Sequence, residues 1–148
     1  AWQLRIAAGQ ALSLKQEDIE IKGHAIECRI NAEDPNANFQ PQPGLIETYQ
    51  TPLKNDDAGL RFDTHIEEGY KIPPYYDSMI GKMITHGDDR SEAIERMKQA
   101  LSNTKVVGVP TTINLHQQIL RHADFLTGKY TCQFLGDHLT ELTTAPDA

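Results

Sequence analysis

A short run of alternating apolar and polar residues constrains the fold of this chain more than any other segment. Residues 25–31 read Ala-Ile-Glu-Cys-Arg-Ile-Asn. Because successive side chains of a β-strand point to opposite faces, the run predicts a strand with one apolar face and one face that carries Glu27, Arg29 and Asn31. From the pattern alone, this polar face is either solvated surface or part of a binding site.

The other segments predict an α+β fold with a mainly antiparallel sheet and helices toward the C-terminus. The strands expected from alternation and composition are residues 19–21, 25–31, 45–50, 60–65, 79–86 and 105–109. The strand at 79–86 is apolar on both faces at several positions, which is typical of a central strand. The expected helices are residues 4–8, about 89–101, 111–122 and 134–142.

Local signals refine this outline at three places. The turn-forming run 54–59 predicts that the strands on either side of it form a hairpin. Asp89 and Glu92 have the spacing of a capping box at the start of a helix. Residues 1–142 are expected to form one domain, and the polar residues 143–148 a frayed tail.

Charge and cysteine content narrow the classes of function. A net charge of −7 over 148 residues argues against a nucleic-acid binder and against docking on anionic lipid. No apolar run approaches the length of a membrane span, and the first residues do not resemble a signal peptide. Cys28 and Cys132 lie far apart, which favours a reducing compartment such as the cytoplasm. A mitochondrial matrix protein without its transit peptide would look the same.

Familiar catalytic constellations are missing from the sequence. None of the six histidines is followed by another four residues later, so we expect no metal site. Gly81-Lys82 lacks the upstream glycine and the following Ser or Thr of a P-loop, and no Gly-x-Gly-x-x-Gly follows a strand. We therefore expect no self-sufficient nucleotide site on this chain.

Residues 23–35 resemble a signature of the biotin carboxylase C-terminal domain, which reads Gly-His-Ala-(Ile/Val)-Glu-(Cys/Ala)-Arg-Ile-Asn-Ala-Glu-Asp-Pro. Further segments resemble other parts of that family in the same order; these are residues 3–9, 39–44, 73–82 and 96–101. Together they cover almost the whole chain. The resemblance implies a rudimentary, single-hybrid-like α+β domain with a mainly antiparallel sheet and flanking C-terminal helices.

The family carboxylates biotin with MgATP and bicarbonate through carboxyphosphate. The resemblance implies that ATP and magnesium are bound by an ATP-grasp portion absent from this chain, so the chain alone would be inactive. Its partners would be that portion, a biotin carrier domain, a carboxyltransferase and a second copy of the enzyme. Acetyl-CoA carboxylase of fatty acid biosynthesis and the propionyl-CoA, methylcrotonyl-CoA, pyruvate and urea carboxylases all share this domain.

The resemblance also suggests roles for particular residues. Arg29 aligns with the catalytic arginine that stabilises negative charge on the ureido oxygen of biotin. Glu27 either orients that guanidinium or forms an ordinary surface ion pair, and Asn31 supports it. Tyr76 and Asp77 either line the biotin side of the site or belong to a packed structural loop.

A last segment concerns assembly. Gly59-Leu60-Arg61-Phe62 matches the end of a hairpin that contributes to a two-fold dimer contact in bacterial biotin carboxylases, which implies a contact role for Arg61. Residues 54–58 depart from the usual short Gly-Gly-Phe turn of that hairpin. The alternative function for the whole chain is a non-catalytic module for subunit contact.

Overall fold

The alternating strand lies in a three-stranded antiparallel sheet. The computed structural model describes residues 2–51 and 59–144. Strand β8 (Met79–Gly87) is central, and β1 (His24–Asn31) and β6 (Leu60–Thr64) pair with it on either side. The order β1-β8-β6 makes β1 an edge strand of this sheet, which bears on the site described below.

Short strands and helices complete the domain. The two-stranded pairs are β2–β3, β4–β7 and β5–β9. Their bounds are Glu33–Asp34 (β2), Gln40–Pro41 (β3), Gly44–Leu45 (β4), Thr48–Gln50 (β5), Lys71–Ile72 (β7) and Lys105–Val107 (β9). The helices are α1 (Trp2–Ala7), α2 (Arg90–Ser102), α3 (Ile113–Ile119), α4 (Ala123–Thr127) and α5 (Phe134–Thr144), with 3-10 turns at Gln16–Asp18 and Pro35–Ala37.

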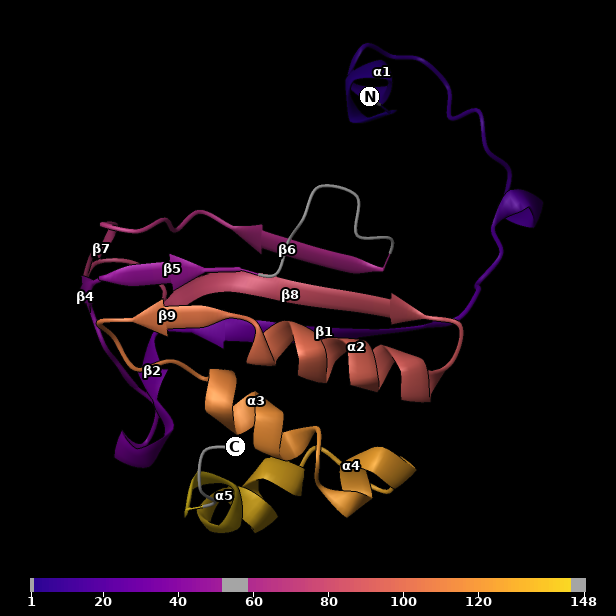
Figure 1. Ribbon diagram of the computed structural model, residues 1–148. Coiled ribbons are helices and arrows are strands. Elements are labelled where there is room, and N and C mark those ends of the chain that lie inside the picture. The colour runs from indigo at the N-terminus through magenta and orange to yellow at the C-terminus, as the bar shows by residue number, and fades with distance from the viewer. Residues whose placement is uncertain (1, 52–58, 145–148) are drawn as a thin grey trace.

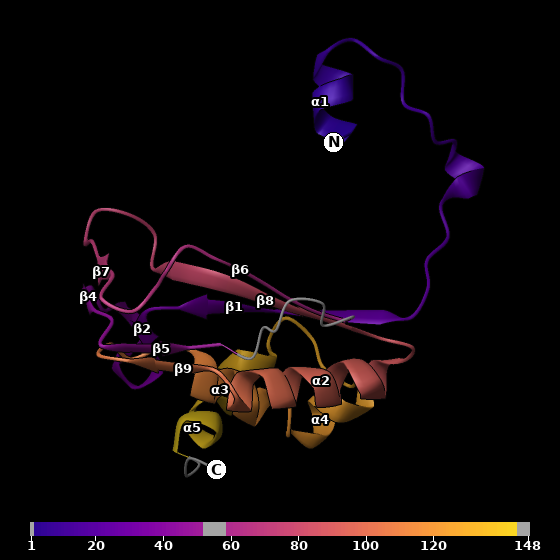
Figure 2. The same ribbon diagram turned by 45° about the horizontal axis from the view of Figure 1, so that its top comes forward.

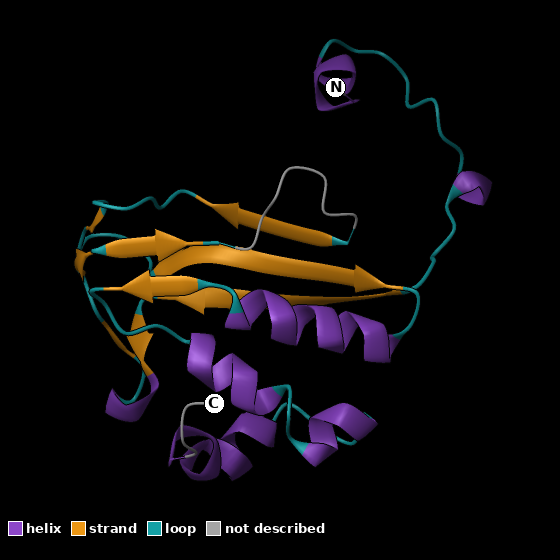
Figure 3. Ribbon diagram, viewed as in Figure 1, coloured by secondary structure: helices purple, strands orange, loops and turns teal. Residues whose placement is uncertain are grey.

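The helices α2 to α5 gather on one side of the sheet, whereas the N-terminal arm leaves from its edge and rises on the other side (Figures 1 and 2). Figure 3 shows the same separation, with the strands forming one layer over the purple helices. The arm comprises residues 2–23, and helix α1 within it has no buried residue. One face of the sheet is thus covered by this chain's own helices.

The apolar half of the alternating pattern forms the core under the sheet. Cys28 and Ile30 of β1 and Met83 of β8 are buried in the cluster that includes Met97 and Leu101 of α2. Burial in this apolar environment, with a smaller contribution from the charge of Glu27, raises the pKa of the Cys28 thiol to about 12. The thiol therefore behaves as a small apolar side chain at neutral pH.

The N-terminus of α2 carries the predicted capping residues in a modified form. Asp89 is the N-cap, and its carboxylate accepts from the amide of Glu92 at 2.9 Å. The Glu92 carboxylate accepts from the amide of Asp88 at 2.6 Å instead of from the N-cap residue. That hydrogen bond, together with Arg96, lowers the pKa of Glu92. Both acidic residues thus satisfy amide groups at the start of α2.

The structure confirms the α+β class and the central strand, but it corrects several boundaries. The strand expected at 19–21 does not form, because these residues belong to the arm and have no neighbouring strand to pair with. The expected hairpin is wrong, since β5 pairs with β9 and β6 pairs with β8. Helix α4 was not expected, and α5 extends two residues beyond the predicted end at Leu142.

Two expectations fall wholly or partly outside the described residues, namely most of the turn at 54–59 and the end of the tail at 145–148. Within the described residues, every helix is too short or too polar to cross a membrane.

Candidate functional site

The polar half of the alternating pattern lies on the sheet face opposite the helices. Residues directly opposite each other in antiparallel strands point to the same face, so the pairing register defines rows of side chains across the sheet. One row consists of Arg29, Lys82 and Asp63, contributed by β1, β8 and β6. The neighbouring row consists of Glu27, Ile84 and Arg61. A band of charged side chains therefore crosses this open face.

The guanidinium of Arg29 remains accessible on this face. Its Nε donates to the Met79 sulfur at 3.4 Å, a weak acceptor that leaves the Nη groups available. Met79 starts β8 and pairs with Asn31 of β1. In the part of the chain that the structure describes, Arg29 forms no ion pair with Glu27, so the orienting role of Glu27 stays a prediction.

The backbone of Arg29 is held from the outer edge of β1 by the start of α3. The carbonyl oxygen of Arg29 accepts from His116 Nε2 at 2.8 Å and from Thr112 Oγ1 at 3.2 Å. The Asn31 amide donates to Thr112 Oγ1 at 3.1 Å, and its carbonyl accepts from the Thr112 amide at the same distance. These contacts replace the neighbouring strand that an edge strand lacks.

His116 acts as a neutral hydrogen-bond donor in this arrangement. Burial lowers the pKa of His116, and its hydrogen bond to the Arg29 carbonyl opposes that shift. A neutral imidazole carries one N–H, which Nε2 presents to Arg29. Sequence reasoning missed both His116 and Thr112, because they lie more than eighty residues from Arg29 and belong to no motif that we recognised.

Asn31 connects the strand to the neighbouring loops. Its side-chain amide donates to Glu33 at 3.0 Å and reaches Ser78 Oγ at 3.5 Å, and the Ser78 hydroxyl donates to the same Glu33 carboxylate. The side-chain oxygen of Asn31 is buried and accepts no hydrogen bond from the described residues. This network positions the loop before β8, which is compatible with a supporting role for Asn31.

Tyr76 and Asp77 lie in the loop that leads into β8. Tyr76 is 83% exposed and borders an open pocket of about 210 Å³ that prolines 41, 43, 73 and 74 also line. The Asp77 carboxylate accepts from the Met79 amide at 2.8 Å, next to the residue that contacts Arg29. The two side chains are thus available to a ligand, but the structure shows no direct contact of either with Arg29 within residues 2–51 and 59–144.

Arg61 is paired within its own strand. Its guanidinium donates two hydrogen bonds to the Asp63 carboxylate, at 2.8 and 2.7 Å, and these raise the pKa of Arg61 and lower the pKa of Asp63. The arginine side chain is 71% exposed on the open face. It is therefore accessible to a partner, and its predicted dimer role stays a prediction.

Comparison with known proteins gives one consistent family. Residues 27–137 match the family described as Biotin carboxylase C-terminal domain. The sequence is 52% identical to biotin carboxylase 1 of Bacillus subtilis over 133 residues, which cover 90% of this chain and 29% of that protein. It is 49% identical to the chloroplastic biotin carboxylase of Arabidopsis thaliana over 140 residues, which cover 95% of this chain and 26% of that protein.

Solved structures agree with the sequence comparison. The biotin carboxylase domain of a thermophilic 2-oxoglutarate carboxylase superposes with a TM-score of 0.91 at 43% identity, covering 98% of this chain and 32% of that one. The biotin carboxylase subunit of pyruvate carboxylase gives the same TM-score at 45% identity, covering 98% and 31%. The chain thus spans less than a third of the length of these relatives.

Proposed function

The chain belongs to the family of biotin carboxylase C-terminal domains, and from this premise we propose that it supplies the biotin-side wall of a biotin carboxylase active site, with Arg29 as its catalytic residue. The single observation that carries the proposal is the contrast between the two ends of Arg29. Its peptide group is held at the sheet edge by Thr112 and His116, whereas its guanidinium reaches the uncovered face.

The proposed role follows from the chemistry of the guanidinium. Biotin is carboxylated at a ureido nitrogen, and loss of its proton places negative charge on the ureido oxygen. The guanidinium of an arginine is a planar cation that presents a fixed set of donors to such an oxygen. A donor fixed before the reaction stabilises developing charge without reorganising, and removing one such donor typically costs about 3 kcal/mol. The contacts of Thr112 and His116 with the Arg29 carbonyl would hold β1, and with it the guanidinium, in such a fixed position.

The neighbouring residues receive proposed roles of two kinds. Tyr76 and Asp77 would contact the biotin ring or its linker, because Tyr76 is exposed beside the pocket and the exposed Asp77 accepts from the amide of Met79, the residue that contacts Arg29. Asn31 would act as a positioning residue through Glu33 and Ser78. Glu27 lies on the same face as Arg29 and would act as a second positioning residue that orients its guanidinium.

The rest of the active site would come from another part of a longer enzyme. The open sheet face and the apolar residues of the arm, among them Leu4, Ile6 and Ile21, require a covering surface that the described residues do not provide. One related biotin carboxylase domain was solved with MgADP and bicarbonate, and that chain is about three times as long as this one. We assign ATP and magnesium to the corresponding ATP-grasp portion and expect the chain alone to be inactive.

Reconstitution with that portion tests the proposal. The chain is mixed with the ATP-grasp portion of the same enzyme, and bicarbonate-dependent ATP turnover is measured with free biotin. Arg29→Ala should lower the biotin-dependent rate by a factor of about a hundred, which corresponds to the loss of one oxyanion donor. The matched control is Arg121→Ala, an exposed arginine at the end of α3. Equal rates for the Arg29 variant and the parent chain would refute the assignment.

A second function, subunit contact, is favoured by the exposed apolar arm and by Arg61. One related domain was solved as a dimer. If the chain binds the ATP-grasp portion or itself without restoring turnover, and if Arg29→Ala has no effect on that binding, a contact role alone would explain its presence.

A further inference from the structure

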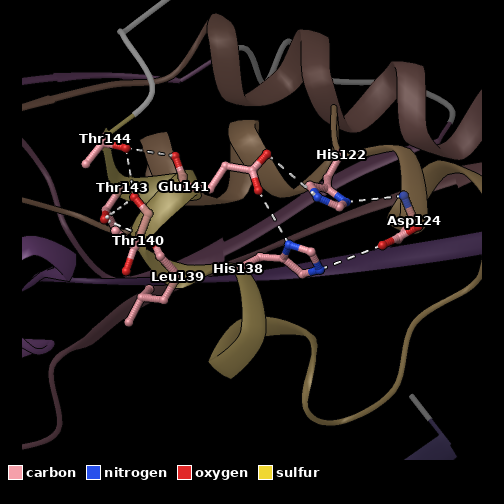
Figure 4. A network of polar contacts seen from close by, with 8 residues as sticks. All are labelled: His122, Asp124, His138, Leu139, Thr140, Glu141, Thr143 and Thr144. Carbon is pink, nitrogen blue, oxygen red and sulfur yellow. Dashed lines mark hydrogen bonds and ion pairs between the residues drawn. The ribbon is translucent and has the colours of Figure 1, made fainter.

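We infer that His122, His138 and Glu141 form a binding site for a zinc ion, separate from the Arg29 face. His122 is the N-cap residue of α4, and the other two lie one turn apart on α5. Figure 4 shows the Glu141 carboxylate joined by dashed lines to both imidazoles. One ligand atom from each residue lies within 4.8 Å of the other two, which places three zinc-type donors around one point.

The individual distances are close to those that a metal requires. Glu141 Oε2 lies 3.5 Å from His138 Nδ1, and Glu141 Oε1 lies 3.9 Å from His122 Nε2. Two ligands of a tetrahedral zinc ion with bonds near 2.1 Å stand about 3.4 Å apart. The Glu141 side chain is 68% exposed, so rotation of this side chain can adjust its distances to the two ring nitrogens.

Asp124 supplies the second carboxylate that such sites usually contain. Its Oδ2 lies 3.7 Å from His138 Nε2, the ring nitrogen that points away from Glu141. A metal-bound histidine commonly donates its other N–H to a carboxylate, which fixes the tautomer and the ring orientation. Asp124 is therefore a positioning residue here, and the two carboxylates give the site the negative charge that a divalent cation needs.

The surroundings also favour a defined site over a loose surface cluster. The two imidazole rings have a centroid separation of 4.3 Å with their planes tilted by 54°, and the buried ring of Phe134 contacts both. The side chains of His122 and His138 are only 14% and 28% exposed. The aromatic wall restricts both rings, and the solvent side next to Glu141 leaves room for water as a fourth ligand.

Zinc binding would change one hydrogen bond in a measurable way. His122 Nδ1 accepts from the Asp124 amide at 3.2 Å, so the proton of this neutral ring resides on Nε2. Coordination through Nε2 requires that proton to move to Nδ1, where it opposes the Asp124 amide. Zinc binding therefore removes the side-chain cap of α4, and the Asp124 amide should exchange with solvent faster in the zinc form.

The test uses Zn²⁺ alone and the 148-residue chain carrying Cys132→Ser, because the exposed thiol of Cys132 would otherwise bind zinc. Titration against a chromophoric chelator should give one zinc per chain. His138→Gln and Glu141→Gln should each weaken binding at least tenfold, and Asp124→Asn should weaken it about 10- to 100-fold. Asp137→Asn, at an exposed position of the same helix, is the control for loss of one negative charge and should bind like the parent.

Folding of every variant is checked by circular dichroism. If a histidine variant fails to fold, Glu141→Gln still tests the site, because the Glu141 side chain is largely exposed and its replacement should not disturb the fold. Faster hydrogen exchange at the Asp124 amide with zinc, absent in Glu141→Gln, supports the assignment. The assignment would be overturned if His138→Gln and Glu141→Gln bound zinc as tightly as the parent. It would also be overturned if the parent did not saturate at one zinc per chain.

Discussion

His116 Nε2 lies 2.8 Å from the carbonyl oxygen of Arg29, although eighty-seven residues separate the two in the chain. The contact joins the edge strand of the sheet to the first turns of α3. It fixes the peptide from which the proposed catalytic guanidinium projects, without occupying the guanidinium itself. The Arg29 carbonyl is therefore held by α3 and the residue before it, whereas its guanidinium contacts Met79 of β8.

Replacing Arg29 by lysine separates charge from geometry. Lysine keeps the positive charge but lacks the planar set of donors, so it cannot present two parallel hydrogen bonds to one oxygen. We expect Arg29→Lys in the reconstituted enzyme to be slower than the parent and faster than Arg29→Ala, with ATP binding unchanged. Steady-state rates with free biotin check this. A lysine variant as active as the parent would show that only charge is needed.

His116 and Thr112 both donate to the Arg29 carbonyl, so the effects of replacing them on stability should be coupled. His116→Ala alone should destabilise the fold by about 1 kcal/mol, because Thr112 Oγ1 still donates to the same carbonyl. Combining it with Thr112→Val should cost more than the sum of the single changes, by about 0.5–3 kcal/mol. Urea unfolding of the four proteins measures the coupling, with the exposed His24→Ala as control. Additive effects would argue against a shared acceptor.

His116 should also make stability depend on pH. Its pKa is lowered in the folded state by burial, whereas in the unfolded chain it is near 6.5. Below about pH 6.5 the unfolded state binds a proton that the folded state does not, so the free energy of unfolding falls as the pH is lowered, by at most about 1.4 kcal/mol per pH unit from this residue. Above about pH 6.5 this contribution is fully present.

Urea unfolding at about pH 7.5 and about pH 5.5, on either side of the ordinary histidine pKa, checks the expectation in the parent and in His116→Gln. The parent should lose more stability between the two values than the variant does. An equal loss in both proteins would assign the pH dependence to other groups.

The core beneath the site should be more sensitive than the arm. Met97 is fully buried against β1 and β8, and Met97→Ala should lower the free energy of unfolding by about 2–5 kcal/mol. Leu4 in the arm is 77% exposed, so Leu4→Ala should change it by less than about 0.5 kcal/mol. Both variants are compared by urea unfolding. A larger effect at Leu4 would mean that the arm packs on the domain in solution.

The parts of the fold that were predictable from the sequence are those recorded in a local pattern of apolar and polar residues. The alternation at residues 25–31 correctly predicted β1, and its apolar side chains are the ones that face α2. The apolar run at 79–86 correctly predicted the central strand. In both cases the residue pattern itself records burial, because the apolar side chains of each strand pack in the core on the helix side of the sheet.

Features that depend on distant partners were not predictable in this way. The pairing of β5 with β9 replaces the expected hairpin, and no local residue pattern records which of two remote strands will lie alongside. The same reason hid the contact of His116 with Arg29 and the approach of His122 to His138. Histidine spacing along one helix could not detect two rings brought together by α4 and α5.

The strand order β1-β8-β6 has a consequence for synthesis on the ribosome. Arg29 is made before its neighbouring strand β8, which follows about fifty residues later, and before His116, which follows later still. At roughly 5–20 residues per second, the interval between Arg29 and His116 lasts about 4–17 s. Until β8 has been made, β1 is an unpaired nascent segment with an apolar face. A chain that ends before α3 still lacks Thr112 and His116, which hold the Arg29 carbonyl.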